Sequence, residues 1–191
     1  VIDKSNGNYG STINAALPVA RGKYVKILDS DDWFDPQALT RFLECLSRTD
    51  ADVAVTHFTV IHADGSKELA KYNLYGREPY GYGEVYDYDT VLADGHIRFF
   101  LMHSLCYRTQ MLLDNGYRQT EGVSYTDLEW DTYPLFYARS IVFFDLDLYQ
   151  YNMARAGQTM DPKVLFKSLG QMETVTGRLI EFYENWDSSR L

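Results

Sequence analysis

The sequence is poor in cysteine, in basic residues and in long apolar runs. Its two cysteines, Cys45 and Cys106, lie far apart without metal-ligand spacing, which favours reduced, buried thiols. No apolar run approaches the length of about 20 residues that crosses a bilayer. Lysine and arginine number 18 against 27 acidic residues, and the net charge of −9 argues against a nucleic-acid partner. What is left is a globular protein whose acidic clusters can hold a divalent cation.

The alternation of strand and helix patterns predicts an α/β fold in a single domain. Expected helices cover 10–20, 36–48, 89–94, 108–115 and 126–138, and expected strands cover 23–28, 51–63, 97–107, 140–145 and 148–151. Residues 73–88 read as an irregular loop, and Asp64-Gly65 closes a hairpin. We expect residues 1–160 to form the main part and 161–191 a closing amphipathic helix packed on the same domain.

Three carboxylates, Asp29, Asp31 and Asp32, follow the strand expected at 23–28. Ligands of open α/β sheets bind at the carboxyl ends of strands, so these acids lie at a ligand-binding edge. Carboxylate oxygens suit Mg or Mn, which share their ligands with substrate phosphates. The alternative is an Asp-rich loop that caps the next helix. Because Asp35, followed by Pro36, already provides that cap, the pattern favours a metal site.

Four ordered stretches lie in and before this turn, namely Asn6-Gly7, Ser11 to Asn14, Ala20-Arg21-Gly22-Lys23-Tyr24, and Leu28 to Pro36. Together they resemble glycosyltransferase family 2. The resemblance implies a GT-A fold, which is a Rossmann-like mixed sheet flanked by helices, with 1–160 as its catalytic domain. Because Val1-Ile2-Asp3 runs directly into a loop, we expect the domain to be truncated at the amino terminus, without the first nucleotide-binding strands.

The same resemblance assigns roles by position. Asp29 would lie near the ribose and donor sugar, and Asp31 would bind the Mg or Mn ion on the diphosphate. Asp32 would either contact the donor sugar or hold the turn. A second group flanks the nucleotide, namely Asn6, Gly7 and Asn14. An Asn-Gly pair is also a good turn in its own right, and Ile13 stands where many members have arginine.

Asp127 is the candidate general base for the acceptor hydroxyl. The stretch from Ser124 to Trp130 resembles the family's acidic helix start, with Asp127 in the second acidic slot. Thr126 and Glu129 have capping-box spacing, so a purely structural interpretation of this stretch is also available, with Glu129 as the cap. A helix dipole acting on Asp127 would lower its pKa.

A late polar loop carries the remaining donor-site candidates. Arg155, Gln158 and Thr159 resemble an Arg-x-Gly-Gln-Thr stretch found in part of the family, which implies that Arg155 meets the diphosphate and the other two line the same site. The alternative for Arg155 is a surface residue near Asp145 or Asp147. The tyrosines between 72 and 88 could form an acceptor platform, although plain packing is the simpler interpretation.

The resemblance thus implies transfer of a sugar, with inversion, from a nucleotide-diphosphate donor to a hydroxyl of a glycan or lipid-linked saccharide. By analogy the setting is bacterial cell-envelope or exopolysaccharide synthesis, in the cytoplasm or in peripheral association with the inner membrane face. One alternative is a catalytically silent carbohydrate-binding or scaffold protein of the same fold. Another is a nucleotidyltransferase, which would need a Gly-rich phosphate loop that this sequence lacks.

Overall fold

The computed structural model describes residues 1–72, 80–95, 100–154 and 166–186. Its centre is a seven-stranded mixed sheet in the order β1-β6-β3-β7-β2, with β4 added to β3 and β5 added to β7. The long strands β3 (Val53–Ile61) and β7 (Ser140–Asn152) pair in parallel, and every other pairing is antiparallel. The expected fold class, a mixed α/β sheet flanked by helices, is confirmed.

The strand β7 was predicted as two strands and is one. Between the pairs Val55↔Phe143 and His57↔Asp147 the register shifts, because β7 accommodates three residues, 144–146, opposite Thr56. Asp145 is exposed at this irregularity and interrupts the apolar pattern. A bulge leaves residues unpaired without ending the strand. The apolar pattern is therefore interrupted near Asp145, although the β7 backbone continues to Asn152.

The edge strand β1 is shorter than the strand predicted at 23–28, and the other edge strand, β2, was not predicted. Strand β1 is only Tyr24–Val25, paired with β6 (Leu105–Arg108), and β2 is Trp33–Phe34, paired with the end of β7. The backbone pairing of β1 with β6 ends at Val25. Beyond it, the side chain of Lys26 makes the contact, because its Nζ donates to the carbonyls of His103 and Leu105 at 2.7 and 3.0 Å. Part of the strand expected at 97–107 is instead a turn before β6, in which Ser104 N donates to Leu101 O.

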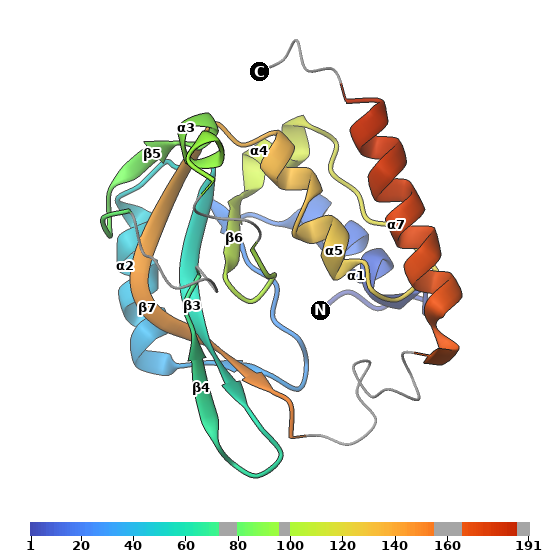
Figure 1. The fold of residues 1–191 in the computed structure, drawn as a ribbon, viewed down its shortest axis with the longest axis horizontal. Helices are drawn as coiled ribbons and strands as arrows, with labels where there is room; N and C mark the ends of the chain where they lie inside the picture. Colours follow the sequence, from blue (N-terminus) through green and yellow to red (C-terminus); the bar gives the residue numbers. More distant parts are fainter. Residues whose placement is uncertain (73–79, 96–99, 155–165, 187–191) are drawn as a thin grey trace.

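Helices cover both faces of the sheet, as Figure 1 shows. Helix α2 (Pro36–Ser47) lies on one face, where Phe42 packs edge-on against Phe144 of β7. The larger core cluster lies on the opposite face, on the side of α1 (Asn8–Ala16), α3 (Tyr88–Ala93) and α4 (Thr109–Asp114). These four helices confirm the predictions, and Asp35 caps α2 by accepting from Gln37 N and Ala38 N at 3.0 and 2.8 Å.

The prediction of one continuous helix over 126–138 is wrong. It divides into α5 (Asp127–Trp130) and the 3₁₀ helix η2 (Tyr133–Phe136). Pro134 has no N–H to donate to the carbonyl of Trp130, which accepts instead from the Tyr107 hydroxyl at 2.9 Å. Helix α7 (Leu169–Glu184) packs beside this segment, with Phe182 against Tyr133 at a ring distance of 4.3 Å.

Two smaller elements complete the sheet. Strand β4 (Lys67–Ala70) forms the predicted hairpin with β3, and Gly65 adopts a φ of 81° in its turn. Strand β5 (Val85–Asp87) lies in the segment predicted to be irregular, because its pairing with β7 is set by tertiary contact. The division at residue 160 stays a prediction, since residues 155–165 lie outside the described part. No helix of the described chain is long and apolar enough to cross a membrane.

Candidate active site

The acidic turn after β1 is held against the end of β7. Both carboxylate oxygens of Asp32 accept hydrogen bonds, one from the Tyr149 hydroxyl at 2.5 Å and one from Asn152 N at 2.8 Å. The Tyr149 oxygen in turn accepts from Asp29 N at 3.2 Å, and Asn152 Nδ2 donates to Asp31 O at 3.3 Å. Of the two roles considered for Asp32, these contacts support holding the turn.

Asp29 is partly buried, as are Asp31 and Asp32. The pKa of Asp29 is raised to about 6, mainly by burial. The nearby carboxylates of Asp32, Asp31 and Asp127 contribute to this rise, and a hydrogen bond from the Tyr9 hydroxyl opposes it. Tyr9 belongs to α1 and Asp127 to α5. Two helices and the acidic turn itself therefore meet at the Asp29 carboxylate. The repulsion among these acids is the interaction that a bound cation relieves.

Asp127 comes to the same place from the beginning of α5. Its charge acts on Asp29, on Tyr9 and on Tyr151 of β7, although nearly a hundred residues separate it from the turn. The predicted lowering of its pKa is wrong. Burial raises the pKa of Asp127, and the hydrogen bonds from its own N–H and that of Leu128 only partly oppose this. Helix α5 is a single turn, so its dipole is small compared with the loss of hydration.

Glu129 is not the cap of α5, which corrects the capping-box prediction. Thr126 makes no side-chain capping bond. Glu129 is 1% exposed and accepts from both the backbone N and the Oγ1 of Thr120, each at 2.6 Å. A tertiary partner has displaced the local one, because the buried carboxylate needs donors and Thr120 supplies two.

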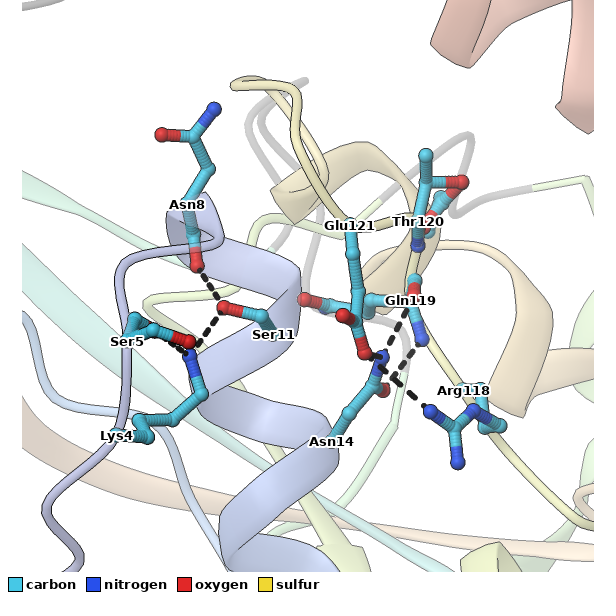
Figure 2. A network of polar contacts seen from close by, with 10 residues as sticks. Lys4, Ser5, Asn8, Ser11, Asn14, Arg118, Gln119, Thr120 and Glu121 are labelled. Atoms are coloured by element: carbon cyan, nitrogen blue, oxygen red, sulfur yellow. Dashed lines mark hydrogen bonds and ion pairs between the residues drawn. The ribbon is translucent and has the colours of Figure 1, made fainter.

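Asn6 and Gly7 lie at the beginning of α1. Asn14, near the end of the same helix, ties α1 to the segment 118–121 (Figure 2). Asn14 Nδ2 donates to Gln119 O and to Glu121 Oε1 at 2.8 Å, and its Oδ1 accepts from Gln119 N at 2.9 Å. Asn6 Oδ1 accepts from Asn8 N at 3.0 Å. A Cβ on Gly7 would lie 2.7 Å from Ser11 Oγ, so only glycine fits there. Their predicted contacts with a nucleotide stay predictions.

Comparison of the sequence with models of known protein families identifies the family of this chain. Residues 1–108, more than half of the chain, match the model of "Glycosyl transferase family 2". The chain belongs to glycosyl transferase family 2. The resemblance found in the sequence is thereby confirmed.

Several relatives of this family 2 chain cover it to different extents. EpsH of Bacillus subtilis is 23% identical over 181 residues, which are 91% of this chain and 51% of EpsH. The succinoglycan biosynthesis protein ExoO of Rhizobium meliloti is 36% identical over 64 residues, 34% of this chain and 18% of ExoO. The chain therefore spans about half of EpsH and less of ExoO.

A solved structure confirms the fold. TarS of S. aureus (residues 1–349), crystallised with UDP-GlcNAc, has a TM-score of 0.56 and 20% identity over 84% of this chain and 43% of TarS. Its complex with UDP gives a TM-score of 0.52 over the same share of this chain. This likeness establishes a GT-A fold of mixed sheet and flanking helices for the family 2 chain.

The donor set of the family 2 chain fits a cation held jointly with phosphates. No group of three or more His, Cys, Asp or Glu side chains suited to a metal occurs among the described residues. Magnesium-type sites commonly use one or two carboxylates and take their other ligands from substrate and water. Asp31 supplies one such carboxylate in the same turn as Asp29, whose pKa is raised mainly by burial and less by the neighbouring carboxylates. Arg155, Gln158 and Thr159 lie outside the described residues.

Sequence reasoning missed the residues that support the acids. Tyr9, Tyr149 and Asn152 contact the turn from α1 and β7, and no spacing in the sequence links them to it. Behind Asp127, burial raises the pKa of Asp131 well above its usual range and lowers that of Lys26 to about 8. The described tyrosines of 72–88 mainly pack: Tyr72, Tyr80 and Tyr88 are buried, and Tyr80 stacks on Phe143.

Proposed function

We propose that this chain carries the transfer site of a nucleotide-sugar glycosyltransferase. The observation that carries the proposal is the meeting of Asp127 with Asp29 and the acidic turn across the fold. Family 2 membership and the fold shared with TarS, which was crystallised with UDP-GlcNAc, support a nucleotide-diphosphate donor.

In the proposed reaction an acceptor hydroxyl oxygen attacks the anomeric carbon of the donor sugar. The bond from that carbon to the diphosphate breaks, and its electron pair leaves with the diphosphate. Asp127 takes the hydroxyl proton, and a base with a raised pKa is better matched to this task than an ordinary aspartate. One attack from the face opposite the leaving group inverts the anomeric configuration.

The remaining residues bind and orient the donor. Asp31 would hold a Mg or Mn ion, whose charge stabilises the departing diphosphate when bound. Asp29 would face the ribose and donor sugar, with Asn6, Gly7 and Asn14 beside the nucleotide. Arg155 would contact the diphosphate, and Gln158 and Thr159 would line the same site. Tyr149 and Asn152 keep the turn in place through Asp32.

The proposed acceptor is a glycan or lipid-linked saccharide in bacterial cell-envelope or exopolysaccharide synthesis. The description of ExoO as a succinoglycan biosynthesis protein supports this setting. The proposed location is the cytoplasm or the inner membrane face.

Calorimetric titration with UDP, GDP and TDP, with and without manganese, tests the proposal. One nucleotide should bind in a manganese-dependent way, and Asp31→Ala should abolish that binding because it removes the metal ligand. Asp64→Ala is the matched control, since Asp64 is an exposed acid in the β3–β4 turn. Absence of binding for every nucleotide, both with this chain and with a version extended at its amino terminus, would support the catalytically silent alternative.

A further inference from the structure

A cavity of about 840 Å³ lies between the segment after α4, the α5–η2 segment and helix α7. Its walls include Gln119, Tyr133, Tyr137, Arg178, Phe182 and Trp186. Neither the acidic turn nor Asp127 lines it. The cavity is therefore separate from the candidate active site and has no role in the reaction described above.

Two polar atoms in residues lining this cavity have no hydrogen-bond partner within the described chain. Gln119 is 4% exposed, and its Nε2 donates to the Tyr117 hydroxyl at 3.0 Å while its Oε1 accepts nothing. The buried Nε1 of Trp186 likewise donates to nothing. Buried groups without a partner are unfavourable, so both atoms favour a polar partner at the cavity wall.

Aromatic rings form one side of the cavity. Phe182 lies against Tyr133 and Trp186, with ring centroids 4.3 and 5.5 Å apart, and Trp186 lies 5.3 Å from Tyr137. Such surfaces bind apolar faces, and the hydroxyls of Tyr133 and Tyr137 add polar edges. The ligand should thus have a flat apolar face bordered by hydrogen-bonding groups.

The charges around the cavity are mixed in sign. Arg118 and Arg178 line it together with Asp114, Glu129 and Glu181. Glu129 is already bonded to Thr120, and Arg118 lies 3.3 Å from Glu121, so neither sign dominates. A nucleoside diphosphate would need a clearly positive site. Planar amides and guanidinium groups beside aromatic rings instead match a neutral ligand rich in hydroxyls.

We propose that this cavity binds a neutral oligosaccharide at a site distinct from the transfer centre. The choice of a saccharide rests on the proposed function, because the acceptor or product glycan is the hydroxyl-rich molecule at hand. Helix α5 separates the two sites: Asp127 acts on the acidic turn, whereas Glu129, two residues later, holds Thr120 at the cavity wall. Residues two apart on a helix point to opposite sides.

Titration of the chain with maltotetraose, cellotetraose and chitotetraose, up to about 10 mM, tests this site by calorimetry. At least one of these probes should bind without nucleotide or metal. Arg178→Ala should weaken binding about tenfold, and Glu181→Trp should abolish it by filling the cavity. Arg41→Ala on the exposed face of α2 is the matched control and should change nothing. Thermal melting of each variant verifies that it folds.

Three results would overturn the proposal: no binding of any probe, binding unchanged in both Arg178→Ala and Glu181→Trp, or displacement of the probe by UDP with manganese. Displacement would place the saccharide in the transfer centre. Nucleotide binding without saccharide binding refutes only the cavity site. Saccharide binding with the expected variant effects, but without nucleotide binding, refutes only the proposed transfer function.

Discussion

In two acidic segments, Asp29 to Asp32 and Asp127 to Glu129, different carboxylates have different structural roles. In each, one acid holds the scaffold: Asp32 accepts from Tyr149 and Asn152, and Glu129 accepts twice from Thr120. In each, a second acid, Asp29 or Asp127, lies where the two turns meet, and burial raises its pKa, as it also does for Asp32. Neighbouring carboxylates can thus have opposite tasks, and the partner of each decides which task it has.

Replacing the site-facing acid of the second turn should have the largest effect. Asp127→Asn should lower sugar transfer about a thousandfold, because the acceptor proton has no base, while nucleotide binding stays intact. Release of nucleoside diphosphate from the donor measures the rate, and calorimetry measures binding. Asp64→Asn, which changes an exposed acid in the β3–β4 turn, is the control. Normal transfer by Asp127→Asn would rule out this residue as the base.

Replacing the scaffold acid of the same turn should act on stability. Glu129→Ala should reduce the free energy of unfolding by about 3 kcal/mol, because two buried donors of Thr120 lose their acceptor. Urea denaturation measures the change. Glu173→Ala, an exposed glutamate on α7, should be neutral. An equally small effect of both variants would contradict the scaffold role.

Loosening the first turn should have a smaller effect. Tyr149→Phe removes the hydroxyl that binds Asp32 and Asp29, and we expect a loss of about 1–1.5 kcal/mol in unfolding free energy. Metal-dependent nucleotide binding should weaken as well, because the turn is less fixed. Tyr183→Phe on the exposed face of α7 serves as the comparison. Unchanged stability and binding in Tyr149→Phe would show that Asn152 alone holds the turn.

The smallest effect should appear in the pH profile. Burial raises the pKa of Asp127, so its carboxylate, the form that accepts a proton, is lost on acidification earlier than in an ordinary aspartate. Transfer should therefore fall about tenfold per unit below this raised pKa. Acidification should change stability in the opposite direction to the transfer rate. Because the pKa of Asp127 is higher in the folded than in the unfolded chain, its contribution to the free energy of unfolding rises as pH falls through this pKa. A rate that falls only near the usual aspartate pKa would contradict the burial of Asp127.

The sequence by itself determined the features that depend on adjacent residues. Asp35 and Pro36 start α2 because a cap and a fixed φ act within one turn of backbone. The turn at Gly65 and the order of strands and helices follow from equally local preferences. The family followed from a dense motif around Asp29, and a family model matches the same region.

Tertiary structure alone decided what the acids do. The continuity of β7 through its bulge, the partners of Asp32 and Glu129 and the direction of the Asp127 pKa all depend on residues outside the local stretch. Local signals predicted a cap at Glu129 and a lowered pKa at Asp127, and both predictions were wrong. Burial changes the hydration of a carboxylate more than one helical turn can offset, and only the folded chain determines which groups are buried together.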